Sequence, residues 1–161
     1  MQMQTSRIPA AIDGLLTLCT GAAAPGGPLA GVRIYDGPPV SDLSDELLLF
    51  IGDDPAGEDS VTGTQEYATL GRPGKDETFT IYCCAASRSG NVDMKRERGR
   101  AFGIVGAVER LVRPNEPGGD TQLGGAVLWS GVGGDITLSQ MQTNTGALAR
   151  VTFGVVCRAR L

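Results

Sequence analysis

Histidine, the side chain that most often serves as a general base in enzymes, does not occur in this sequence of 161 residues. Its absence excludes Ser-His-Asp and Cys-His catalysis, histidine metal sites and a histidine pH switch. The four cysteines form no Cys-x-x-Cys pair of the kind that binds zinc or carries redox chemistry. We expect them to be reduced, mostly buried small residues of an intracellular protein. They are Cys19, Cys83, Cys84 and Cys157.

Two glycine-rich stretches resemble phosphate-binding loops, and both fail on the residues that matter. Residues 69–76 resemble a P-loop, but Thr69 stands where the first glycine belongs and Asp76 follows Lys75. Residues 131–136 begin like a dinucleotide fingerprint, but Ile136 occupies the place of the last glycine and no helix is expected to follow. We therefore interpret these glycines as turn residues.

Acidic residues gather after position 52, and they offer the remaining possibility for metal or acid–base chemistry. Their spacing does not follow the calcium loop, so solvated acid is the simpler interpretation. No acid is expected on a clearly apolar strand face, where its pKa would be raised, so no pair of catalytic carboxylates is nominated. We predict that the protein is not an enzyme and has no cofactor or metal. The clustered acids are Asp53, Asp54, Glu58 and Asp59.

Composition and charge narrow the class of protein further. Hydrophobic residues make up 41% and charged residues 20%, which is ordinary for a soluble globular protein, so we expect a single domain over residues 1–161. A net charge of −4 argues against a broadly basic surface that grips nucleic acid. No run approaches about 18 apolar residues, and the first residues lack a signal-sequence pattern, so we expect assembly in a cytoplasm and no membrane.

The clearest structural pattern lies in residues 147–161. Every second residue from Ala147 to Leu161 is apolar, which predicts a long strand with one buried face. Residues 143–146 favour a turn, so this strand closes a hairpin. Three arginines lie on the other face: Arg150, Arg158 and Arg160.

The remaining elements complete an α+β domain with one mostly antiparallel sheet, a long C-terminal hairpin and two main helices packed on the sheet. Residues 53–75 show no period, so we predict a long loop there that binds a partner. We expect helices over residues 8–19 and 93–113, and strands over residues 32–36, 47–52, 77–86, 125–132 and 136–143.

The second predicted helix places three glycines opposite its apolar stripe. Each costs about 1 kcal/mol of helix stability relative to alanine, so an outward glycine face calls for an explanation. Glycine lets another backbone approach closely, which suits a neighbouring copy of the same protein, although general glycine richness is an equal alternative. These residues are Gly99, Gly103 and Gly106, flanked by Arg96 and Arg110.

Basic residues open the same helix, where cations do not favour the helix dipole. Solvated charge is the default interpretation of Lys95, Arg96, Arg98 and Arg100. The alternative is pairing between subunits with the acidic residues 53–59.

With these elements placed, the chain resembles the tail terminator proteins of long-tailed bacteriophages. The similarity is carried by the order of IPAAIDGLL, VRIYDGPPV, DELLLFIG, KDETFTIYCC, RERGRAFGIVGAVERLV, LGGAVLWSG and QTNTGALARVTFGVVCRARL. The resemblance implies an α+β fold that forms a hexameric ring on the last tube ring, ends tail elongation and presents a surface to the head connector. It implies a virion protein whose partners are itself, the tail tube protein and the connector, with DNA only passing non-specifically through the lumen. It supplies no catalytic motif.

Two sets of contact residues follow from our interpretation of the sequence. A different head-to-tail connector or neck protein is the alternative function, and a small-ligand-binding domain is the remote one. The predicted subunit interface comprises Arg96, Arg98, Gly99, Arg100, Gly103, Gly106 and Arg110. The predicted tube or neck contact comprises Asp53, Asp54, Glu58, Asp59, Arg72, Lys75, Arg150, Arg158 and Arg160.

Overall fold

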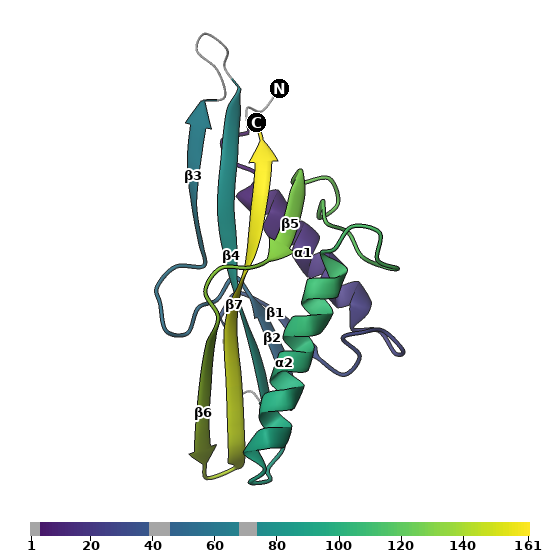
Figure 1. The fold of residues 1–161 in the computed structure, drawn as a ribbon, viewed down its shortest axis with the longest axis vertical. Coiled ribbons are helices and arrows are strands. Elements are labelled where there is room, and N and C mark those ends of the chain that lie inside the picture. Colours follow the sequence, from purple (N-terminus) through teal and green to yellow (C-terminus); the bar gives the residue numbers. More distant parts are fainter. Residues whose placement is uncertain (1–3, 39–45, 68–73) are drawn as a thin grey trace.

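The computed structural model of this chain describes residues 4–38, 46–67 and 74–161. These residues form two helices and seven strands in one α+β domain, in agreement with the predicted class (Figure 1). In chain order the elements are α1 (Ile8–Ala22), β1 (Arg33–Asp36), β2 (Leu47–Ile51), β3 (Val61–Tyr67), β4 (Lys75–Arg88), α2 (Met94–Leu111), β5 (Trp129–Val132), β6 (Thr137–Thr143) and β7 (Gly146–Arg160).

β4 and β7 form the long centre of the sheet. They pair antiparallel from Asp76 with Arg160 to Arg88 with Leu148, and the path through the sheet is β1-β2-β4-β7-β5. β3 extends the free edge of β4 in one half of the molecule, and β6 extends that of β7 in the other half (Figure 1). Among the described strands only β1 and β2 pair in parallel, so the prediction of a mostly antiparallel sheet is confirmed.

The alternation in residues 147–161 produces the expected strand. Val151, Phe153 and Val155 of β7 are buried against the helices, and each contributes about 1.5–3 kcal/mol through burial. β6 pairs with β7 from Thr137 with Thr152 to Thr143 with Gly146, which confirms the closing hairpin.

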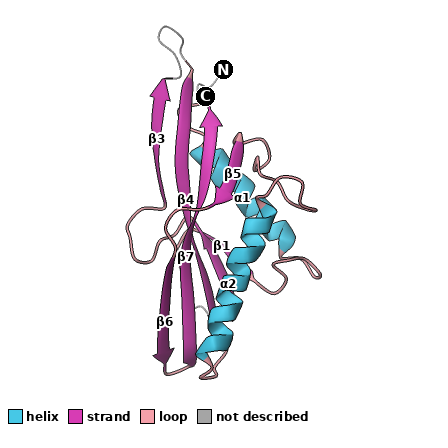
Figure 2. Ribbon diagram, viewed as in Figure 1, coloured by secondary structure: helices cyan, strands magenta, loops and turns pink. Residues whose placement is uncertain are grey.

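Both helices cover the same face of the sheet (Figure 2). The apolar stripe of α2 lies in the core as predicted, and the Asp93 carboxylate caps the helix by accepting a hydrogen bond from the Arg96 backbone N–H. The other face carries a small second cluster around Phe50 and Cys84. Because neighbouring residues of β2 alternate between the two clusters, that strand is buried on both faces, as its apolar run predicted.

The predicted loop over residues 53–75 is wrong at residues 61–67, which form β3, and at Lys75, which begins β4. β3 pairs with β4 from Val61 with Ile81 to Tyr67 with Lys75. Both of its faces are largely exposed. Since neither face is buried, its sequence does not alternate between apolar and polar residues. Gly63 fits this strand closely, since a Cβ there would lie 2.6 Å from the Cβ of Phe79.

The strand predicted over residues 125–132 begins later than expected, at Trp129. Gly124 and Gly125 have φ angles of +73° and +88°, which belong to turns and not to strands. The Asp120 side chain accepts hydrogen bonds from the backbone N–H groups of Gln122 and Gly124 and stabilises the turn.

Candidate interaction surfaces

The outward face of α2 has open space beside its three glycines. A Cβ added at Gly99, Gly103 or Gly106 would meet no atom within 4 Å. Arg110 is exposed near the end of this helix. The glycines therefore lie outward as predicted, and no side chain or backbone of the described residues packs closely against them. Their role in a subunit contact stays a prediction.

The basic start of α2 has more internal contacts than we expected. An Arg98 guanidinium nitrogen donates to the Gln140 side-chain oxygen at 2.9 Å, so α2 is tied to β6. Arg100 forms ion pairs with Glu46 at 3.3 Å and with Glu97 at 3.7 Å. Solvated charge is therefore the wrong interpretation for Arg100, and it holds best for Arg96, whose side chain is exposed.

Glu97, in the first turn of α2, is fully buried and was not singled out from the sequence. Its carboxylate accepts hydrogen bonds from the hydroxyls of Ser87, at 2.6 Å, and Ser89. Burial raises the pKa of Glu97, but these two hydroxyls and the nearby Arg100 outweigh that effect and hold its pKa below the usual range. The site is a charged buried group whose bonds are all internal.

Glu77 is a second buried acid, and it contradicts the expectation that no acid lies on an apolar strand face. It shares the helix-covered face of β4 with Phe79 and is 2% exposed. Its carboxylate accepts hydrogen bonds from the Ser6 hydroxyl, the Arg7 backbone N–H and the Gln65 side-chain amide, at 2.6–2.7 Å. Glu77 therefore caps the start of α1, where a negative charge is favourable. The sequence could have indicated this, because residues 77 and 79 are two positions apart in a strand and so face the same side of the sheet.

The three arginines of β7 lie on the sheet face away from the helices, as predicted, but they differ in their surroundings. Arg160 donates to the Asp76 carboxylate at 2.8 Å, and this hydrogen bond holds the pKa of Asp76 below its usual range. Arg158 is exposed, and Arg150 is half-buried. Arg158 and Arg160 are thus both exposed, and Arg160 is held by its ion pair with Asp76.

The predicted tube or neck contact is spread over the molecule. Partial burial and the neighbouring Asp54 raise the pKa of Asp53, and Arg150 partly offsets this rise. Lys75 begins β4, and its ammonium nitrogen lies 5.6 Å from the centre of the Tyr67 ring. Arg72 lies outside the described residues. The structure brings Asp53 near Arg150 but does not gather the set into one site.

Glu58 and Asp59 are exposed just before β3. They do not share a site with the arginines of β7. The described residues contain no group of three or more His, Cys, Asp and Glu side chains that could hold a metal ion.

The cysteines are free and buried, as expected. Burial raises the pKa of Cys84 to about 11 and those of Cys19 and Cys157 to about 12. The pKa of Cys83 is raised further, chiefly by burial. Thiols with such high pKa values are poor nucleophiles at neutral pH.

A cavity of about 630 Å³ near the start of α1 is lined by basic side chains, but these already have partners. Arg7 donates to the carbonyl oxygens of Gly125 and Ala126, and Arg160 pairs with Asp76. Two of its three basic side chains are therefore already engaged, and Lys75, the third, lies over the Tyr67 ring.

No helix within the described ranges is both long and apolar enough to cross a membrane. Comparison with known proteins found no matching family model and no matching curated protein.

Proposed function

We propose that this chain is a ring-forming structural protein of a bacteriophage tail, a tail terminator that caps the tail tube and ends its elongation. The order of seven sequence blocks is the basis for the family. The α+β architecture agrees with the fold that this family implies.

The observation that carries the proposal is the contrast between the buried and exposed polar groups. Glu77 and Glu97, the two buried acids, are engaged in internal hydrogen bonds to backbone and hydroxyl groups. By contrast, the outward glycines of α2 and the exposed Arg158 of β7 have open surroundings. Such a molecule offers surfaces for contact and holds its buried charges in structural roles.

Each exposed surface has a role in this proposal. The glycine face of α2, with Arg96 and Arg110, contacts the next subunit of a homohexamer. The sheet face with Arg150 and Arg158, together with Asp53 and Asp54, meets the tail tube or the head connector. The ring assembles in the host cytoplasm and remains at the head-proximal end of the tail, with DNA passing through its lumen without specific contacts.

Native mass spectrometry of the purified chain, combined with pull-downs against tail tube and portal-side proteins, tests this proposal. A hexamer that retains tube protein is the expected result. A twelve-fold ring that binds only portal-side protein would identify a neck protein instead. Protein that binds neither class, whatever its oligomeric state, would refute both.

A further inference from the structure

Two strands of the sheet, each seven residues long, leave one edge without a partner in the described structure. β3 pairs with β4 alone, and β6 pairs with β7 alone (Figure 1). The other two edge strands, β1 and β5, have four residues each. Long edge strands are normally protected by lysine or proline, yet β6 contains no charged residue and β3 contains only Glu66. Both edges are therefore suited to pairing with another strand.

The free edge of β6 lies beside an exposed apolar strip. The hydrogen bond between Arg98 and Gln140 fixes α2 against β6, and the Gln142 side chain donates to the Val92 carbonyl oxygen at the start of the helix. Phe102 lies one turn after Arg98 in α2, and Leu138 lies two residues before Gln140 in β6. The two elements run in opposite directions, so from this spacing we infer that Phe102 and Leu138 stand at the same level. Phe102 is 39% exposed and Leu138 is 38% exposed.

We propose that β3 of one copy of this chain adds to the free edge of β6 of a neighbouring copy, antiparallel, and so continues the sheet between subunits. β3 runs antiparallel to β4, β4 to β7, and β7 to β6. Antiparallel addition of β3 to β6 therefore keeps both copies in the same orientation. It also keeps their helices on the same side of the sheet.

The faces of the two strands restrict the register. Odd-numbered residues of β3 and even-numbered residues of β6 share the helix-covered face, as their pairings with β4 and β7 require. One register that matches the faces sets Tyr67 of one copy opposite Leu138 of the other. Tyr67 is 69% exposed, so this register buries its ring against Leu138 and Phe102.

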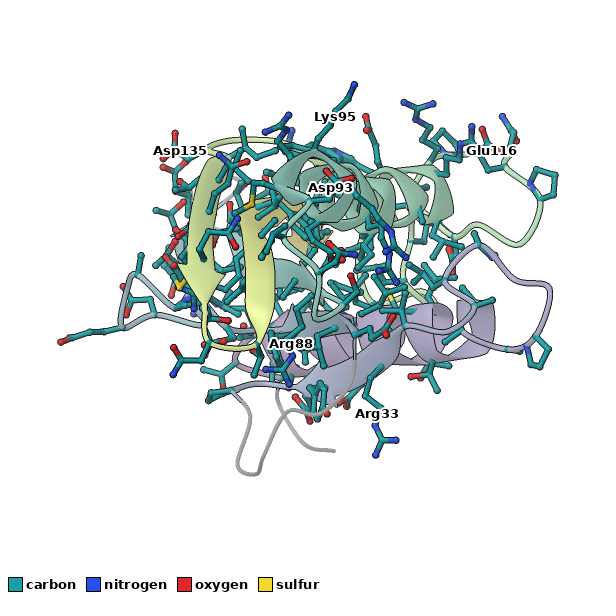
Figure 3. All side chains as sticks on the ribbon, turned by 90° about the horizontal axis from the view of Figure 1, so that it is seen from below. Arg33, Arg88, Asp93, Lys95, Glu116 and Asp135 are labelled. Atoms are coloured by element: carbon teal, nitrogen blue, oxygen red, sulfur yellow. The ribbon has the colours of Figure 1, made fainter. Side chains whose placement is uncertain are left out.

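Charge complementarity supports a second copy as the occupant of this edge. In the same register the residues just before β3, Glu58 and Asp59, pass the end of β6 and reach the start of α2. Lys95 and Arg96 stand there, both exposed, and Figure 3 shows Lys95 projecting away from the helix. Opposite charges therefore meet where the two strands end.

The contact joins two different surfaces of the same chain, and such contacts form rings when the rotation between copies closes. The pairing itself is a property of the purified chain. Its use in a tail ring rests on the proposed function.

Cysteine cross-linking tests the register directly. Thr64 and Met141 are both exposed, lie on the face away from the helices, and stand opposite each other in the proposed pairing. Mixing Thr64→Cys protein with Met141→Cys protein under oxidation should give a disulfide-linked dimer, whereas each variant alone should give none. Pairing Thr64→Cys with Gln140→Cys is the matched control, because position 140 lies on the other face. The native cysteines are buried and should stay unlinked.

A charged residue placed on the free edge of β6 provides the second test of the pairing. Leu138→Lys should weaken self-association at least about tenfold in sedimentation experiments, because a charge would be buried at the contact. Leu128→Lys, at an exposed leucine just before β5, should leave self-association unchanged, and circular dichroism should show both variants folded.

Several outcomes would overturn the strand pairing. Cross-linking of Met141→Cys alone would indicate a symmetric β6–β6 contact instead. No mixed cross-link at the highest soluble concentration, or equal cross-linking of the control pair, would also reject it. Cross-linking without tube binding would reject only the tail function, and tube binding without cross-linking would reject only the strand pairing.

Discussion

Replacing Glu97 by glutamine removes a negative charge from a fully buried site while nearly keeping the shape of the side chain. The carboxylate accepts hydrogen bonds from Ser87 and Ser89 and lies 3.7 Å from an Arg100 nitrogen. A hydrogen bond to a charged group contributes about 1.5–3 kcal/mol, and one between neutral groups about 0.5–1.5 kcal/mol. With two such bonds weakened and the ion pair removed, Glu97→Gln should lower the free energy of unfolding by about 2–3 kcal/mol.

In a domain of this size, 1 kcal/mol corresponds to about 2–4 °C in melting temperature, so Glu97→Gln should melt about 4–12 °C below the wild type. Thermal denaturation followed by circular dichroism at pH 7 measures this shift. Glu109→Gln is the matched control on the same helix, because Glu109 forms only an exposed ion pair with Arg113 and should matter by about 0.5 kcal/mol or less. Equal melting temperatures of the two variants would refute the assignment of Glu97 as a stabilising buried charge.

The pH dependence gives an independent check on Glu97. Its pKa is lower in the folded state than in the unfolded chain, so the stability it contributes is present above the unfolded pKa, near 4.3. This stability is lost as the pH falls through the lower, folded pKa. The difference in melting temperature between wild type and Glu97→Gln should therefore shrink as the pH is lowered from 5 toward 3. A difference that grew over this range would show that the sign of the shift is wrong.

Three further predictions concern other parts of the molecule. Gly103→Leu should leave the circular dichroism spectrum unchanged, because a Cβ there has open space, but should weaken ring assembly in native mass spectrometry; a normal ring would argue against a contact through the glycine face. Gly63→Val should detach β3, because its Cβ would lie 2.6 Å from the Cβ of Phe79; hydrogen exchange should show faster exchange in β3, and unchanged protection would contradict this. The four cysteines should react with a thiol reagent at pH 8 only after unfolding, since burial raises every thiol pKa well above 8; rapid labelling of native protein would disprove their burial.

The sequence predicts those elements that bury one face. β7 and α2 were predictable because alternation and helical spacing record which side chains meet the core. β3 was not, because a strand exposed on both faces is held by its backbone pairing with β4, and backbone hydrogen bonds leave no trace in side-chain periodicity.

The surroundings of the charged residues were harder to predict than the elements that carry them. Arg100 lies on α2, whereas its partner Glu46 comes just before β2, far away in sequence, and only the packing of α2 near the start of β2 brings them together. Ser87 and Glu97 likewise meet only because the turn between β4 and α2 folds back. Glu77 is the exception, since the alternation of β4 alone predicts that its side chain faces the core, as it does.

The pairing of β4 with β7 also determines when the protein can fold. Residue 88 of β4 pairs with residue 148, and residue 76 pairs with residue 160, so the central partners lie 60 and 84 positions apart in sequence. β7 leaves the ribosome after every other described element, yet it lies next to β4, β5 and β6. Until it emerges, β4 lacks its longest neighbour and the apolar stripe of α2 has only part of its sheet to cover. Folding should therefore be slow, because the central pairing of the sheet joins strands that lie far apart in sequence.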